Sequence, residues 1–228
     1  MKKEYRIIVS GGGTGGHIFP ALSIADAIKS KYPDAKILFV GADNRMEMQR
    51  VPDAGYEIVG LPIAGFNRKN MLKNIKVLWL ILKSQRMAKK IIKKFAPHAV
   101  VGVGGYASGP TLKMAAGMNI PTLIQEQNSY AGVTNKILAK TARMICVAYD
   151  GMERFFPKEK IKFTGNPVRS SLIKMRTNRS EAIRAMGLEE NKKCVLIVGG
   201  SLGARSINEA ILANIETIRE NGNINFIW

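Results

Sequence analysis

Short apolar segments alternate with longer amphipathic ones along most of the chain. The apolar segments are rich in Val, Ile and Leu and end near Gly, Pro or Asn, which is typical of buried β-strands. Between most of them, apolar residues recur at the spacing of a helix with one buried face. The pattern predicts strands at 6–10, 37–40, 57–61, 99–103, 122–124, 144–148 and 161–164, and helices at 21–31, 44–54, 71–95, 111–118 and 134–141.

Strands that alternate with helices favour an α/β fold with a parallel sheet covered on both faces. Gly165-Asn166-Pro167 interrupts the pattern, so we predict one domain at 1–165 and a linker with the incomplete start of a second domain at 166–228. The second part is predicted to hold helices at 179–187 and 207–221 and strands at 193–199 and 224–228. One such unit cannot cover both faces of its own sheet, so we expect the sequence to be a fragment of a longer protein.

Three glycine-rich loops follow predicted strands, at residues 11–16, 102–110 and 199–204. Glycines let the backbone approach a ligand closely, and a helix that follows such a loop adds the positive end of its dipole. In parallel sheets, ligands bind at the carboxyl ends of the strands, where these loops lie. The three loops together predict an enzyme that handles phosphate or diphosphate groups.

The first loop also fits the Gly-x-Gly-x-x-Gly pattern of dinucleotide-binding enzymes. That pattern requires an acidic residue about 20 residues further on, and Asp43 comes roughly ten residues too late. The chain has no P-loop pattern and no Cys or His spacing typical of a metal site. We therefore predict no nicotinamide or flavin cofactor and no metal.

Polar residues at two of these strand ends are candidates for catalysis. His17 lies directly on the first glycine loop, where an imidazole can accept a proton or bind a ligand oxygen. The run Gln125-Glu126-Gln127-Asn128 follows the predicted strand at 122–124 and is expected at the same edge of the sheet. A binding site is favoured over a solvated loop at both places.

The net charge is +18, and no Asp or Glu lies between Glu57 and Glu126, an interval rich in Lys and Arg. Such a block predicts an anionic partner: nucleic acid, an anionic membrane surface or a phosphorylated substrate. Nucleic-acid binding requires aromatic residues between the basic ones, and Trp79 is the only aromatic residue between Phe66 and Phe95. The composition therefore favours a lipid surface over nucleic acid.

The predicted helix at 71–95 carries a second apolar stripe, although a helix on a sheet needs only one. The stripe consists of Ile75, Trp79 and Leu82, with Lys76 and Lys83 beside it. We interpret it as a membrane-contacting patch. The alternative is packing against a second part of the chain, such as the segment around Phe66.

Five segments together resemble the MurG family of bacterial N-acetylglucosaminyltransferases, which act in peptidoglycan synthesis: 11–21, 102–110, 125–128, 165–169 and 199–208. Thr14, His17 and Pro20 are the most specific part, and the resemblance runs from residue 5 to the end. It implies a GT-B fold. The chain would then hold a Rossmann-like amino-terminal domain with a parallel sheet and the beginning of a second Rossmann-like domain.

In that family the amino-terminal domain binds a lipid-linked acceptor, and the carboxyl-terminal domain binds most of the donor, UDP-GlcNAc. The resemblance implies donor contacts for Thr14, Gly15, Gly16, Asn128, Arg169 and Ser201. It implies acceptor-side positions for Gly13, Gly104, Gly105 and Tyr106, and acceptor binding or catalysis for His17 and Glu126. The stripe with Trp79 corresponds to the family's proposed membrane patch.

The implied reaction is inverting transfer of GlcNAc from UDP-GlcNAc to the MurNAc 4-hydroxyl of undecaprenyl-diphospho-MurNAc-pentapeptide, which converts lipid I to lipid II. We expect it at the cytoplasmic face of the bacterial inner membrane, with His17 as first candidate for the general base and Glu126 as second. The alternatives are another GT-B glycolipid synthase, a UDP-GlcNAc epimerase, or a non-catalytic basic membrane-surface module. Because the family's later motifs for uracil and ribose are missing, we expect the chain alone to be inactive.

Overall fold

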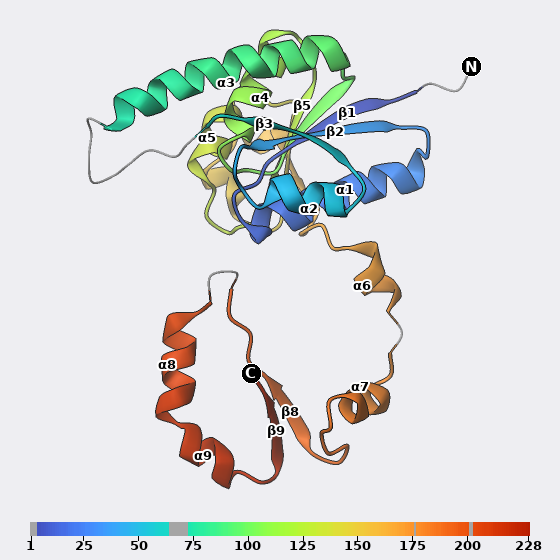
Figure 1. Cartoon of the computed structure of the whole chain (residues 1–228), viewed down its shortest axis with the longest axis vertical. Coiled ribbons are helices and arrows are strands. Elements are labelled where there is room, and N and C mark those ends of the chain that lie inside the picture. The colour runs from blue at the N-terminus through green and yellow to red at the C-terminus, as the bar shows by residue number, and fades with distance from the viewer. Residues whose placement is uncertain (1–3, 64–72, 176, 201–202) are drawn as a thin grey trace. The chain divides into compact units, whose positions relative to one another are not determined.

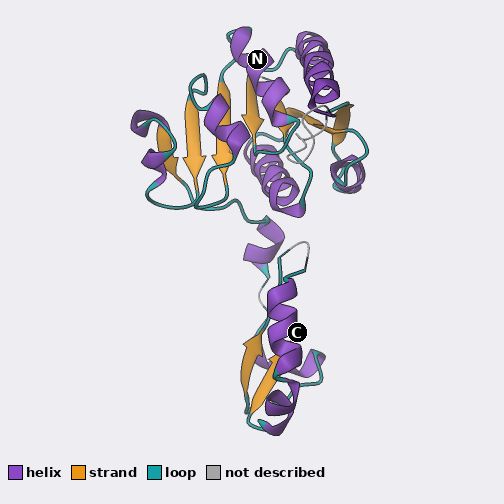
Figure 2. Cartoon of the chain, turned by 90° about the vertical axis from the view of Figure 1, so that its left-hand side faces the viewer, coloured by secondary structure: helices purple, strands orange, loops and turns teal. Residues whose placement is uncertain are grey.

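The computed structural model describes residues 4–63, 73–175, 177–200 and 203–228 (Figures 1 and 2). The strands are β1 (Arg6–Ser10), β2 (Lys36–Ala42), β3 (Glu57–Leu61), β4 (Ala99–Gly102), β5 (Thr122–Glu126), β6 (Met144–Val147), β7 (Ile161–Phe163), β8 (Lys193–Leu196) and β9 (Ile224–Ile227). The helices are α1 (Gly15–Lys31), α2 (Glu47–Asp53), α3 (Lys73–Phe95), α4 (Ser108–Gly117), α5 (Val133–Leu138), α6 (Ser170–Lys174), α7 (Arg179–Ala185), α8 (Arg205–Ala213) and α9 (Ile215–Glu220). Two short 3-10 helices are η1 (Met152–Arg154) and η2 (Lys158–Lys160).

The chain forms two compact units, residues 1–173 and 174–228. The first unit holds a seven-stranded sheet in the order β3-β2-β1-β4-β5-β6-β7, and every neighbouring pair is parallel. The predicted α/β fold with a parallel sheet is therefore confirmed. The chain order reverses between β1 and β4, which pair with each other directly. Loops that leave two such strands in opposite directions open a crevice at the carboxyl end of the sheet.

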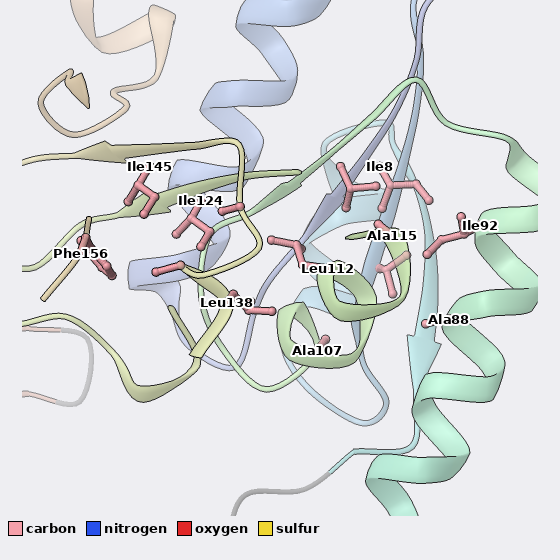
Figure 3. Packing of buried hydrophobic residues seen from close by; sticks show 14 of the residues in the cluster. Ile8, Ala88, Ile92, Ala107, Leu112, Ala115, Ile124, Leu138, Ile145 and Phe156 are labelled. Atoms are coloured by element: carbon pink, nitrogen blue, oxygen red, sulfur yellow. The ribbon is translucent and has the colours of Figure 1, made fainter. Parts of the chain in front are cut away.

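Alternating strand residues build a core on each face of this sheet. On one face, Ile8, Ile124 and Ile145 pack with residues of α3, α4 and α5, including Ala88, Ile92, Leu112 and Leu138 (Figure 3). On the other face, Val9, Phe39 and Val101 pack with Ile18 and Leu22 of α1 and Val51 of α2. Full burial of each large aliphatic side chain contributes about 1.5–3 kcal/mol, so the two cores fix the strand ends from which the site is built.

Three boundaries differ from the predicted ones in ways that matter for the site. Helix α1 begins at Gly15, six residues earlier than predicted, so Gly15, Gly16 and His17 form its first turn. Strand β5 extends to Glu126, two residues further than predicted. In the second unit, the helix predicted at 207–221 is two helices that meet at Asn214.

The second unit is a parallel pair, β8 and β9, joined through α8 and α9. Asn178 caps α7 by accepting a hydrogen bond from the Glu181 amide at 2.8 Å. All four residues of β8 are exposed, including the apolar Val195 and Leu196. Because successive strand residues point to opposite faces, both faces of β8 are exposed.

Candidate active site

The loop between β1 and α1 ends in a helix start that suits an anion. Gly12 and Gly13 have φ of 148° and 91°, values that side chains rarely allow. Thr14 is the extended residue before the helix, and its carbonyl accepts the amides of His17 and Ile18 at 3.1 Å each. The amides of Gly15 and Gly16 open the helix and have no acceptor within it. Two glycine N–H groups and the positive end of the helix dipole thus lie side by side.

The loops after β1 and β4 interlock, which explains why both are rich in glycine. A Cβ atom on Gly105 would lie 2.4 Å from the Gly12 carbonyl oxygen. A Cβ on Gly11 would lie 2.2 Å from Val103 Cγ2. These approaches are too short for any side chain, so the glycines let two backbone segments touch at the point where the strand order reverses. The first two glycine loops therefore form one structure.

His17 is held inside this structure. Its ring lies over Gly104, where a Cβ would be 2.9 Å from both Nε2 and Cδ2. Its Nδ1 is 3.3 Å from Thr14 Oγ1. Burial lowers the pKa of His17 below its ordinary value of 6.5, and this effect exceeds the opposing influence of the Glu126 charge, a backbone hydrogen bond at Gly12 and the Glu47 charge. The imidazole is therefore mainly neutral at pH 7, the form that accepts a proton.

Glu47, the first residue of α2, is a component of the site that sequence reasoning missed. Its side chain is almost completely buried. One carboxylate oxygen accepts the Gly13 amide at 2.9 Å, and the other accepts the Ala42 amide at 3.0 Å. A Cβ on Gly12 would overlap this carboxylate. The Gly13 amide is thus already paired, and the sequence signal was only an acidic residue in the first turn of a helix predicted at 44–54.

Glu126 is also buried, and hydrogen-bond donors surround its carboxylate. Oε1 accepts the backbone amide and the side-chain amide of Asn128, both at 3.1 Å. Oε2 accepts the Gly132 amide at 3.0 Å and Asn135 Nδ2 at 2.9 Å. Four hydrogen bonds thus occupy both carboxylate oxygens and hold the β5–α5 loop. This arrangement fits a residue that positions neighbours better than one that takes up a proton.

A polar network joins β5 to the segment that follows β7. Gln127 Nε2 donates to the Val103 carbonyl oxygen at 2.9 Å, which fixes the β5 end against the second glycine loop. Asn166 accepts from Gln125 at 3.5 Å and donates to the Gln127 carbonyl at 3.3 Å. The first residue after the predicted domain boundary is therefore tied to the first unit.

The structure brings many, but not all, of the predicted site residues together. Arg169 lies against α1, with its guanidinium carbon 4.9 Å from the centre of the Phe19 ring. Tyr106 is half exposed next to Gly105. Ser201 and the side chains of Ile75 and Lys76 lie outside the described residues. Trp79, Leu82 and Lys83 lie on α3.

The exposed side of α3 has the predicted composition. Trp79 and Leu82 are 58% and 54% exposed, and Lys83 Nζ lies 5.2 Å from the centre of the Trp79 ring. Val77, Ala88 and Ile92 are buried on the opposite side. Within the described part of the chain, no cation of α3 forms an ion pair with a carboxylate. The helix thus presents apolar side chains beside unpaired positive charge.

Residues 4–63, 73–175, 177–200 and 203–228 contain no group of three or more His, Cys, Asp or Glu side chains arranged to hold a metal ion. In the same residues, no helix has the length and apolar character needed to cross a membrane.

Comparison with known proteins defines the class: residues 7–147 match the N-terminal domain of glycosyltransferase family 28, and the chain belongs to this family. It is 67% identical over its whole length to a UDP-N-acetylglucosamine--N-acetylmuramyl-(pentapeptide) pyrophosphoryl-undecaprenol N-acetylglucosamine transferase of Phocaeicola vulgatus, of which it covers 60%. It is 65% identical to the Bacteroides thetaiotaomicron protein of the same name, of which it covers 61%. The chain therefore spans about three fifths of the length of these relatives.

Solved structures agree with this class. The crystal structure of Acinetobacter baumannii MurG matches with a TM-score of 0.70 and 28% identity over 93% of this chain and 57% of that one. The UDP-GlcNAc 2-epimerase of Neisseria meningitidis bound to UDP-GlcNAc matches with a TM-score of 0.61 and 14% identity, over 97% and 71%. At that identity the epimerase shows likeness of fold alone. The predicted GT-B fold and the resemblance to the MurG family are confirmed.

Proposed function

We propose that the chain is the acceptor-binding part of an inverting N-acetylglucosaminyltransferase. This enzyme moves GlcNAc from UDP-GlcNAc to the MurNAc 4-hydroxyl of undecaprenyl-diphospho-MurNAc-pentapeptide. The observation that carries the proposal is the position of His17, whose neutral imidazole lies over Gly104 between two interlocked glycine loops. The names of the relatives that match the whole chain support UDP-GlcNAc as the donor and the undecaprenyl-linked molecule as the acceptor.

In the proposed reaction the MurNAc 4-hydroxyl oxygen attacks the anomeric carbon of GlcNAc. The bond from that carbon to the UDP oxygen breaks, and His17 takes the hydroxyl proton. The acceptor diphosphate suits the glycine loop at the start of α1, although the resemblance implies donor contacts for Gly15 and Gly16, whose free amides lie there. Arg169 beside Phe19 is the cation that we assign to the leaving UDP. As proposed, neither the proton transfer to His17 nor the departure of UDP uses a metal or a cofactor.

Glu126 has a different role in this proposal. Its carboxylate is already occupied by four donors, so a proton transfer to it would break hydrogen bonds that hold the β5–α5 loop. Its negative charge instead raises the pKa of His17, whereas burial lowers that pKa. We therefore keep His17 as the base and assign Glu126 to positioning, together with Asn128.

We further propose that α3 attaches the enzyme to the cytoplasmic face of the inner membrane. Trp79 and Leu82 would enter the interface, and Lys83 and its neighbours would contact anionic lipid headgroups. Nucleic acid is not an expected partner. The domain limits that we propose are 1–165 for the acceptor and membrane side and 166–228 for the linker and the start of the nucleotide-sugar domain.

The test is a transfer assay with a chimera in which the chain is continued at Trp228 by the remaining part of the Phocaeicola vulgatus relative. We expect the chimera to transfer radiolabel from UDP-GlcNAc to a lipid I analogue. We expect the 228-residue chain alone to transfer little or none. A chimera that folds but is inactive, beside an active intact relative, would contradict the proposed function.

A further inference from the structure

A groove with a volume of about 590 Å³ lies between α3, α4 and α5. Its apolar walls include Ile81, Tyr106, Pro110, Val133, Ile137 and Leu138. The volume falls within the range of about 300–1,000 Å³ that is typical of small-molecule sites. Because most of the lining is aliphatic or aromatic, the occupant that it suits is a hydrocarbon rather than a sugar or a nucleotide.

The groove exposes apolar side chains that a folded domain normally covers. Val133 and Ile137 are 70% and 68% exposed, and they lie one turn apart on the same face of α5. Among the described residues of the lining, Lys113 is the only charged one and none carries a carboxylate. The wall thus offers apolar contact over most of its area and favours an anionic group over a cationic one.

One loop takes part in both the groove and the candidate active site. Tyr106 lines the groove and directly follows Gly104 and Gly105, which contact His17 and Gly12. This loop therefore connects the residues around His17 with the apolar groove beside α5. An amphiphile with a diphosphate head and a linear hydrocarbon tail matches these two places.

The geometry points to a subsite for the first isoprene units of a polyprenyl diphosphate, between α3, α4 and α5. The identity of the tail rests on the proposed function, whose acceptor carries such a chain. This subsite is distinct from the exposed stripe of α3 with Trp79 and Leu82, which are not among the lining residues and would contact the bilayer. The enzyme would then bind its acceptor by part of the tail as well as by the head.

Calorimetric titration of the 228-residue chain with farnesyl diphosphate, below its micelle concentration, tests the subsite, with inorganic diphosphate as the probe without a tail. Ile137→Gln makes the wall polar, and Gly109→Leu fills the groove. A Cβ on Gly109 meets only Thr134 Cγ2, at 3.5 Å, so α4 tolerates it. The matched control is Ile173→Gln, because Ile173 is 72% exposed and outside the lining.

We expect farnesyl diphosphate to bind at least about tenfold more tightly than inorganic diphosphate, since each buried CH₂ favours binding. Each groove variant should lose about tenfold in affinity for farnesyl diphosphate, whereas the control should not. Affinity for inorganic diphosphate should stay the same in all proteins. If both groove variants bind farnesyl diphosphate like the wild type, the subsite does not exist.

A second arm measures binding to phosphatidylglycerol vesicles. If the groove variants lose vesicle binding but keep farnesyl diphosphate affinity, the groove contacts the bilayer and the proposal is overturned. The transfer assay with the chimera separates this inference from the proposed function. If both groove variants of the chimera transfer GlcNAc like the wild type, only the subsite is refuted. If the groove variants weaken binding of farnesyl diphosphate but the chimera is inactive, only the proposed function is refuted.

Discussion

Replacing Glu47 by Gln tests whether its buried carboxylate holds the first glycine loop. In the wild type, the two oxygens accept the amides of Gly13 and Ala42 at 2.9 and 3.0 Å. A Gln side chain keeps one acceptor and turns an NH₂ group toward the other amide. One backbone N–H and one side-chain donor are then left unpaired in a site closed to water.

The size of the effect follows from these two groups. A buried polar group without a partner costs about 1–3 kcal/mol, so for two such groups we expect Glu47→Gln to lower the free energy of unfolding by about 2–6 kcal/mol. This is a large part of the total of about 5–15 kcal/mol for a domain. For a domain of this length, it corresponds to a fall in Tm of about 4–24 °C.

The assay is thermal unfolding followed by circular dichroism, together with hydrogen exchange of the peptides that contain Gly13 and Ala42. The matched control is Glu57→Gln, because Glu57 begins β3 with an exposed side chain. We expect a lower Tm and faster exchange at both amides in the Glu47 variant only. Equal Tm values for the two variants, with unchanged exchange, would refute the assignment of Glu47 as the support of the loop.

Two other substitutions address the loops and the helix. Gly105→Ala combines a φ of 84° with a Cβ 2.4 Å from the Gly12 oxygen, and should cost about 2–5 kcal/mol in urea unfolding. Gly55→Ala, with a φ of 82° and open space around it, should cost only about 1–2 kcal/mol, and equal losses would contradict the interlock. Trp79→Ser with Leu82→Ser should weaken binding to anionic vesicles by about 2–4 kcal/mol without changing circular dichroism. Unchanged co-sedimentation would assign the stripe to packing within the protein.

The strands were the most predictable part of the fold. β1 and β3 have the predicted limits, because both are short apolar runs between clear breaks. The start of α1 was not predictable from propensity, since Gly15, Gly16 and the internal Pro20 all disfavour a helix. The sheet places the helix there, because Ile18 and Leu22 bury against its face. Tertiary packing thus overrides the local preference at the position that the site uses.

The candidate site was only partly predictable for a related reason. His17 stood out because it follows five glycines, and its neighbour Gly104 lies on a second loop of the same kind. Glu47 gave no comparable signal, because its role depends on contact with Gly13 across the top of the sheet. The chain order likewise does not reveal that the Glu126 carboxylate accepts a hydrogen bond from Asn135, nine residues later. Its hydrogen-bonding capacity is therefore used up by groups that the sequence alone does not identify.

The most direct test of the central claim is the pH dependence of kcat/KM for the chimera and its His17→Ala variant. Because burial lowers the pKa of His17, its base form persists below pH 6.5, so the acid limb of the wild-type profile should have its midpoint below 6.5. His17→Ala should lower kcat by about 10²–10⁴-fold and abolish that limb, with little change in the KM for UDP-GlcNAc. Near-normal turnover of the His17 variant beside an inactive Glu126→Gln variant would contradict the account and make Glu126 the base.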